Sequence, residues 1–181
     1  MRYTSLMGVP LFQLVVQQMK DPAGFEGTLK TPALVWEGPP VRDAPDDAAS
    51  PFDSMPTVIG RNDQAVRSGE VRVYFVKKDP RIANPFSMGV TVGRLATNDL
   101  VLDDASVSRF HAFLQQDPKT SQWVVTDVGS DNGTFVEGQR LEPKAGRPLV
   151  DGARVAFGGA ALVFMLPASL ARYVAKKSAA P

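Results

Sequence analysis

Short apolar runs separated by turn-forming residues fill the chain from Glu70 onward. The runs recur at even intervals, and Gly, Asn, Asp or Pro stands between them. Many short strands at this spacing are typical of an all-β sandwich or barrel. The sequence therefore predicts an all-β domain. Its strands are expected at residues 71–76, 90–92, 100–102, 112–114, 123–125, 134–136, 155–157 and 161–166.

An amphipathic helix is predicted near the N-terminus. Phe12, Val15, Val16 and Met19 recur at helical spacing. Asp21-Pro22 is expected to end the helix, because the residue before a proline avoids helical dihedrals. A strand or a loose tail stays open as an alternative for this segment.

The remainder of the N-terminal third predicts a strand and then a linker. We interpret the apolar run Leu34-Val35-Trp36 as an edge strand, and Gly38 to Pro56, rich in Pro, Asp and Ala, as the linker. The predicted division is an N-terminal extension over residues 1–66 with a short helix and a Pro/Asp-rich linker, an all-β domain over 67–166, and a C-terminal helix or tail over 167–181.

One uncharged stretch near the C-terminus needs a choice between two structures. No charged residue lies between Arg154 and Arg172. The stretch is a little short of the ~20 residues that a membrane-spanning helix needs, and Pro167 divides it. We interpret it as a buried strand followed by the start of a closing helix. The apolar face of that helix carries Leu170, Tyr173 and Val174.

Composition narrows the chemistry. The formal net charge of +1 gives no bulk attraction to nucleic acid or an anionic membrane, so neither is expected as a partner. With no cysteine, disulfides, thiolate metal sites and thiol nucleophiles are excluded, which fits a reducing compartment and an expected cytoplasmic location. His111 is the single histidine, so multi-histidine metal sites are excluded too. We expect no metal and no cofactor.

Arg94, Ser108 and Arg109 lie in predicted loops at strand ends, where a scaffold presents side chains together. An arginine guanidinium offers a planar fork of donors that fits two phosphate oxygens, and it stays charged. The serine hydroxyl adds a neutral donor. Asn132 offers both a donor and an acceptor, which suits the backbone of an extended peptide. Because no base stands beside a nucleophile and no Gly-rich phosphate loop is present, this set indicates binding and not catalysis.

Three pieces in order resemble the signature of the forkhead-associated (FHA) domain family. They are Gly93-Arg94, then Ser108-Arg109-Phe110-His111, then Ser130-Asp131-Asn132-Gly133-Thr134. Each piece alone is common, but their order and spacing, with strands between them, make the combined match specific. The resemblance covers roughly Glu70 to Leu166, a little over half of the chain. It implies an FHA-type β-sandwich of two twisted, mainly antiparallel sheets, with short helices in the terminal extensions.

The resemblance also implies a role for each matching residue. Members of the FHA family bind phosphothreonine peptides, and they recognise the phosphate through arginine side chains. The expected phosphate-binding residues are Arg94, Ser108 and Arg109, and the expected peptide-binding residues are Asn132 and Asp131. The residues expected to shape the loops are Gly93, His111, Gly133 and Thr134.

The implied function is a bacterial-type phosphothreonine-peptide-binding adaptor in Ser/Thr kinase signalling or phospho-regulated assembly. Its partner would be a phosphothreonine-containing protein, such as a Ser/Thr kinase or a kinase substrate. Self-association through Thr28, Thr31 or Thr57, once phosphorylated, is a further expectation. The alternative is a phospho-independent scaffold that uses the sandwich surface for assembly.

Two positions depart from the family pattern. Asp131 places a negative charge near the expected phosphate, and like charges in a partly desolvated site lower affinity unless the carboxylate points away or pairs with Arg109. Asp103 or Asp104 is an alternative partner for Arg109. Glu137-Gly138 stands where relatives often have Asn-Gly, and Asn tolerates a left-handed turn better than Glu.

Overall fold

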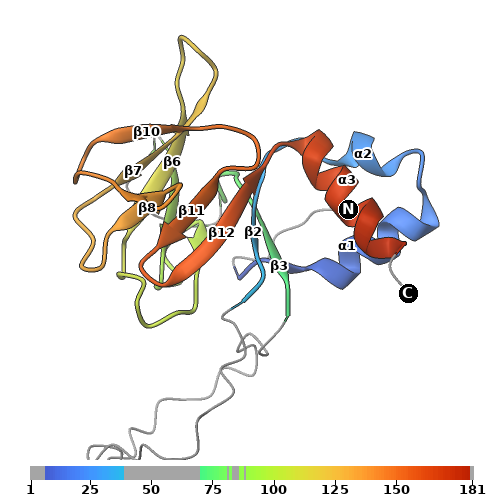
Figure 1. Ribbon diagram of the computed structural model, residues 1–181, viewed down its shortest axis with the longest axis horizontal. Coiled ribbons are helices and arrows are strands. Elements are labelled where there is room, and N and C mark those ends of the chain that lie inside the picture. Colours follow the sequence, from blue (N-terminus) through green and yellow to red (C-terminus); the bar gives the residue numbers. More distant parts are fainter. Residues whose placement is uncertain (1–6, 39–69, 81, 83–85, 88, 180–181) are drawn as a thin grey trace, which may run out of the picture.

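Two β-sheets form the body of the protein in the computed structural model, which describes residues 7–38, 70–80, 82, 86–87 and 89–179 (Figure 1). Among these residues, every strand pairing is antiparallel except that of β4 with β5. The five-stranded sheet has the order β10 (Gly146–Leu149), β7 (Trp123–Asp127), β6 (Ala112–Gln116), β4 (Val90–Gly93) and β5 (Leu100–Val101). The seven-stranded sheet has the order β1 (Val9–Pro10), β3 (Arg72–Phe75), β2 (Ala33–Trp36), β12 (Ala160–Met165), β11 (Arg154–Phe157), β8 (Thr134–Val136) and β9 (Gln139–Arg140).

The main hydrophobic core lies between the two sheets. Inward-facing residues of both sheets join it, such as Val92 and Leu114 from one sheet and Val155 and Phe164 from the other. Strands that alternate inward and outward residues bury one face in this way. The fold is therefore the all-β sandwich that the strand spacing predicted.

A second hydrophobic core lies on the outer face of β2 and β3. There, Val35 and Val73 pack with residues of α1 (Leu11–Lys20), α2 (Phe25–Thr28) and α3 (Pro167–Ser178). Figure 1 shows the three helices gathered together beside these strands. Leu34 and Tyr74, on the opposite faces of the same strands, join the main core. Both faces of β2 and β3 are thus buried, which explains why β2 is wholly apolar and why Val73, Tyr74 and Phe75 follow one another in β3.

The predicted strands are observed, but the position of β2 differs from expectation. We expected an edge strand at Leu34-Val35-Trp36, and instead β2 lies between β3 and β12. The prediction was wrong because a short isolated run carries no signal for its neighbours, which here come from distant parts of the sequence. Three other strands, β1, β9 and β10, were not predicted. Most residues of β9 and β10 are exposed and show no apolar run, and β1 has only two residues.

The N-terminal helix is present and ends at Lys20, but its predicted apolar face is mostly exposed. Phe12 is 61% exposed and Met19 is 66% exposed, and the buried residues are Leu11 and Leu14. The reason is that α1 packs against α3, and this contact selects the Leu11 and Leu14 side. The closing helix α3 buries Leu170 and Val174 as expected.

The turn between β8 and β9 contains Glu137 and Gly138, both with positive φ, at 50° and 75°. The carboxylate of Glu137 accepts a hydrogen bond of 2.8 Å from the backbone N–H of Arg154. This bond explains how a glutamate is held in a conformation that favours Gly and Asn.

Some expectations concern residues outside the described ranges. The predicted linker lies outside them from residue 39 onward, and so does Thr57. The predicted domain boundary at residue 67 lies outside them too, so the division into 1–66, 67–166 and 167–181 stays a prediction. In the part of the chain that the structure describes, no helix has the length and apolar content needed to cross a membrane.

Candidate functional site

Three loops meet at one end of the sandwich and carry the predicted site residues. They follow β4 (residues 94–99), β5 (residues 102–111) and β7 (residues 128–133). Gly93 lets the first two loops approach each other, because a Cβ at this position would overlap the carbonyl oxygen of Arg109 and lie 2.7 Å from Nδ2 of Asn98. The Gly-Arg piece thus owes its glycine to a close backbone approach.

Arg94 is joined to the second loop through both backbone and side chain. Its N–H donates to the carbonyl of Ser108 over 3.0 Å, and its Nε donates to the carbonyl of Val107 over 3.2 Å. The side chain is exposed, and its two Nη groups have no hydrogen-bond partner among the described residues. The anchored Nε and the unused Nη groups leave a guanidinium that is positioned and able to bind an anion.

The first two loops are also tied together by a buried amide. Nδ2 of Asn98 donates to the carbonyl of Leu95 over 2.9 Å and to the carbonyl of Arg109 over 2.8 Å. The exposed side chain of Arg109 makes no ion pair with Asp103 or Asp104, the two carboxylates considered as alternative partners. Arg109 therefore stands beside Arg94's loop as a second available cation.

His111 connects the second loop to the third. Its Nδ1 accepts the backbone N–H of Ser108 over 3.0 Å, so the ring proton lies on Nε2, which is 3.2 Å from the carbonyl oxygen of Gly133. The ring is fully buried, in edge contact with Phe157. Burial lowers the pKa of His111 below its usual 6.5, although the Gly133 carbonyl and the Asp127 carboxylate oppose this shift. His111 is therefore a neutral strut and has no free nitrogen for acid–base chemistry.

Asp127 organises the third loop from inside. Its carboxylate accepts the hydroxyls of Ser130 and Thr134, each over 2.6 Å, and the backbone N–H of Gly129 over 2.7 Å. Burial alone would raise the pKa of Asp127, but the hydrogen bonds from Ser130, Thr134 and Gly129 outweigh burial and lower the pKa to about 2. The carboxylate stays ionised and fixes the loop that carries Asp131 and Asn132.

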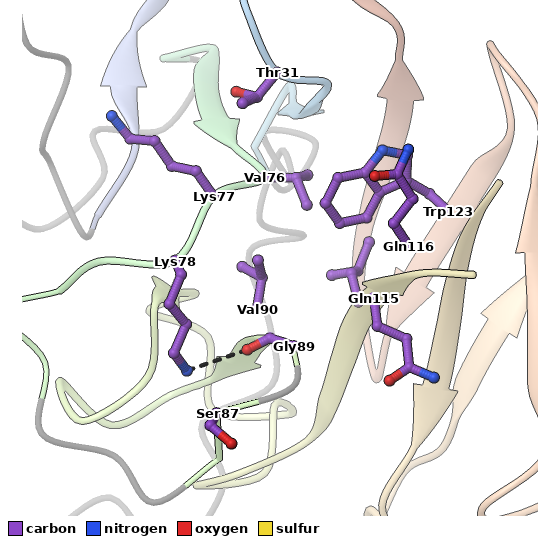
Figure 2. Close-up of a pocket in the computed structure, with 11 residues that line it drawn as sticks. Thr31, Val76, Lys77, Lys78, Ser87, Gly89, Val90, Gln115, Gln116 and Trp123 are labelled. Carbon is purple, nitrogen blue, oxygen red and sulfur yellow. Dashed lines mark hydrogen bonds between the residues drawn. The ribbon is translucent and has the colours of Figure 1, made fainter. Parts of the chain in front are cut away.

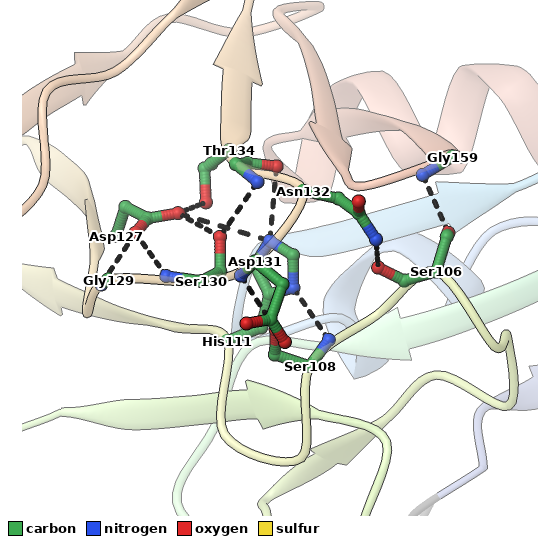
Figure 3. A network of polar contacts seen from close by, with 11 residues as sticks. Ser106, Ser108, His111, Asp127, Gly129, Ser130, Asp131, Asn132, Thr134 and Gly159 are labelled. Carbon is green, nitrogen blue, oxygen red and sulfur yellow. Dashed lines mark hydrogen bonds and ion pairs between the residues drawn. The ribbon is translucent and has the colours of Figure 1, made fainter.

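The predicted phosphate donor Ser108 lies directly against Asp131. The hydroxyl of Ser108 donates to Oδ2 of Asp131 over 3.0 Å and accepts the backbone N–H of Asp131 over 3.1 Å. The two residues come from different loops (Figure 3). Both hydrogen bonds are exposed to solvent. The carboxylate thus points toward the site and does not turn away from it.

Asn132 makes one of the hydrogen bonds available to its side chain. Its Nδ2 donates to the carbonyl of Ser106 over 2.7 Å, and the hydroxyl of Ser106 accepts the N–H of Gly159 over 2.7 Å (Figure 3). This chain of contacts leaves Oδ1 of the exposed Asn132 as an acceptor for an incoming backbone N–H.

Sequence reasoning missed two residues of the site. Ser106 fixes Asn132, and the only signal for it is Asp104, whose carboxylate caps the turn by accepting the N–H of Ser106 over 2.8 Å. Arg140 on β9 lies against Gly133, since a Cβ on Gly133 would be 2.5 Å from Nε of Arg140. Nothing in the local sequence marks Arg140, because only the β8–β9 pairing brings it to the loop.

A hollow of about 320 Å³ lies elsewhere (Figure 2). Val76, Val90 and Trp123 line its apolar part, with Lys77 and Lys78 beside them. Since Val90 begins β4 and Gly93 ends it, the hollow is at the opposite end of the sheet from the three loops. The candidate site is therefore an exposed loop surface and not this hollow.

Comparison with known proteins adds a family to this geometry. Residues 90–158 match the family model of the FHA domain. The oxoglutarate dehydrogenase inhibitor of Corynebacterium jeikeium is 37% identical over 93 residues, which are 50% of this chain and 61% of that protein. The glycogen accumulation regulator GarA of Mycobacterium tuberculosis is 36% identical over 93 residues, 50% of this chain and 54% of that protein. The chain thus spans little more than half the length of these relatives.

A solved structure of an FHA domain is also among the similar proteins. The N-terminal FHA domain of Rad53p from S. cerevisiae, in complex with a phosphothreonine peptide, has a TM-score of 0.45 and 20% identity, over 59% of this chain and 93% of that domain. The matched residues 90–158 include all three signature pieces, and they form the three loops described above. The family model therefore identifies residues 90–158 as a forkhead-associated domain.

Proposed function

We propose that the three loops bind a phosphothreonine-containing peptide, and that the protein is a non-catalytic adaptor in Ser/Thr kinase signalling or phospho-regulated assembly. One observation carries the proposal. The Nη groups of Arg94 are unused among the described residues, and the backbone of Arg94 is hydrogen-bonded to Ser108, the hydroxyl donor of the next loop. A guanidinium anchored to the loop that carries a hydroxyl donor suits a phosphate group.

The phosphate would be held by charge and by hydrogen bonds together. Arg94 would bind two of its oxygens, Ser108 would donate its hydroxyl to one, and Arg109 would add a second positive charge. Phosphothreonine carries about −1.5 to −2 charge at neutral pH, so two arginines match it closely. Asn132 would accept a peptide N–H through Oδ1, while its Nδ2 stays on Ser106.

The absence of catalysis is part of the proposal. Both ring nitrogens of His111 are already engaged, so the single histidine of the chain supplies no general base. The two relatives are named as an inhibitor and as a regulator, which agrees with a binding role.

The proposed partner is a protein phosphorylated on threonine, with a kinase or its substrate as the expected class. Self-binding is a narrower case of the same proposal. Thr28 is exposed and Thr31 is half-buried, so Thr28 is the better kinase target of these two. Mass spectrometry of the native protein that finds no phosphate on the extension would remove self-binding.

Binding to a phosphothreonine peptide library tests the proposed function. We expect phosphate-dependent binding that weakens by on the order of 2–4 kcal/mol in Arg94→Ala, because the fork of charged donors is lost. Arg147→Ala is the matched control, since Arg147 lies on β10 at the far edge of the same sheet. No phosphate-dependent binding, or equal binding by Arg94→Ala, contradicts the proposal.

A second candidate function is phospho-independent scaffolding. The contact between Ser108 and Asp131 favours it, because a carboxylate already holds the hydroxyl that the phosphate would need. The two functions differ in one result: a scaffold captures its partners equally before and after phosphatase treatment, and a phosphothreonine reader does not.

A further inference from the structure

The hydroxyl of Ser108 is enclosed by a single residue of the neighbouring loop. Asp131 contributes its carboxylate as acceptor at 3.0 Å and its N–H as donor at 3.1 Å. A serine hydroxyl has one proton to donate, so donation to Asp131 and donation to a ligand oxygen exclude each other. An anion can therefore accept a hydrogen bond from the Ser108 hydroxyl only after the bond to the Asp131 carboxylate has broken.

A carboxylate is also a chemical likeness of the expected ligand. Like a phosphate, it presents negatively charged oxygens that accept charge-assisted hydrogen bonds. Asp131 therefore offers Ser108 the kind of acceptor that a phosphothreonine would offer, supplied by the chain itself. It also repels an incoming phosphate while it stays in place.

Release of the hydroxyl needs only a side-chain rotation. The backbone N–H of Asp131 bonds to the same Ser108 oxygen independently of the carboxylate, and Asp127 fixes the loop from inside through Ser130 and Gly129. The carboxylate is exposed, so it can rotate into solvent without disturbing the core. The loop thus keeps its shape in both states.

We propose that Asp131 is a built-in competitor for the phosphate position at Ser108, and that it lowers the affinity of the site for phosphothreonine peptides. This inference rests on the proposed function, since it assigns Asp131 a regulatory role in the same site. The carboxylate occupies the hydroxyl in the free protein, and peptide binding displaces it.

Substitution of Asp131 tests the competition. Wild type, Asp131→Asn and Asp131→Ala are screened against one degenerate phosphothreonine peptide library, and the Kd of each for its best peptide is measured by calorimetry. We expect Asp131→Ala to bind about 2- to 5-fold more tightly, the gain typical of an exposed charged contact. The Kd of Asp131→Asn should lie between those of wild type and Asp131→Ala, because asparagine has no charge but keeps an oxygen that accepts a hydrogen bond from the Ser108 hydroxyl.

Two controls separate competition from a general change of charge. Asp103→Asn removes one negative charge from an exposed residue that makes no hydrogen bond within the described part of the chain, and its Kd should equal that of wild type. In a Ser108→Ala background, where no hydroxyl remains to compete for, the gain from Asp131→Ala should shrink. Thermal unfolding confirms that each variant is folded.

The outcomes distinguish this inference from the proposed function. Phosphate-dependent binding by wild type that becomes tighter in Asp131→Ala supports the competition. Phosphate-dependent binding by wild type with no gain in Asp131→Ala overturns the competition alone. No phosphate-dependent binding by any of the proteins overturns both.

Discussion

His111 joins two loops of the site through its two ring nitrogens, and neither nitrogen faces solvent. The family resemblance implied a structural role for this residue, and the contacts give that role a physical basis. The sequence could not predict which ring nitrogen of His111 carries the proton. The position of the proton follows only from the donor on one side, the Ser108 N–H, and the acceptor on the other, the Gly133 carbonyl.

Replacement of His111 by alanine should destabilise the protein by about 3 kcal/mol. The substitution removes one buried and one part-buried hydrogen bond, leaves the Ser108 N–H without a partner and opens a cavity beside Phe157. Urea unfolding measures the loss. Arg109→Ala, at an exposed position two residues away, should change stability by less than about 0.5 kcal/mol. Equal stability of the two variants would refute the strut role.

At the scale of elements, the loops depend on where β4 ends. The carbonyl of Arg109 lies against the α-carbon of Gly93, and no side chain fits between them. Gly93→Ala should therefore push the two loops apart and lower stability by about 1–3 kcal/mol. Gly27→Ala is the control, because a Cβ there meets nothing within 4 Å and its φ is ordinary. The denaturant midpoints of both variants measure this effect. A midpoint of Gly93→Ala equal to that of wild type would contradict this close packing.

The strands of the sandwich could be predicted from sequence because burial on one face leaves alternating or continuous apolar runs between turn residues. β9 and β10 left no such pattern, since their exposed residues are held by pairing alone. The choice between the Phe12 and Leu14 sides of α1 could not be made locally, because both are apolar and α3 decides between them. Likewise, Arg140 reaches the site only through a strand pairing.

The position of β2 predicts how the chain divides. β2 supplies Leu34 and Trp36 to the core between the sheets, and it hydrogen-bonds to both β3 and β12. Burial of each large side chain contributes about 1.5–3 kcal/mol, against a typical domain stability of about 5–15 kcal/mol. A fragment of residues 67–181 should therefore unfold at a much lower temperature than the full chain, or fail to fold cooperatively. Calorimetry that gives the same midpoint for both would show that the extension is dispensable.

At the scale of the whole molecule, stability should fall as the pH drops from 7 towards 5. The folded protein holds His111 neutral with a lowered pKa, so below about 6.5 the unfolded chain binds a proton that the folded chain refuses. The free energy of unfolding is then highest above 6.5 and declines below it. Because His111 is the only histidine, urea titrations at pH 7.5 and 5.5 isolate this effect. Equal or greater stability at pH 5.5 would contradict it.

A second acid step belongs to Asp127. Its lowered pKa of about 2 means that its stabilising contribution is complete above the usual 3.8 and is lost as the pH falls from 3.8 towards 2. The loss is on the order of 1–2 kcal/mol. Thr134→Val removes one of its hydrogen bonds and should move this step to higher pH.

The central claim is that the three loops read phosphate on threonine, and one measurement tests it most directly. The peptide selected from the library is titrated into the full chain by calorimetry in its phosphorylated and dephosphorylated forms. We predict that only the phosphorylated form binds with a measurable Kd, and that Arg94→Ala abolishes or strongly weakens this binding. Equal affinity for the two forms would contradict the account.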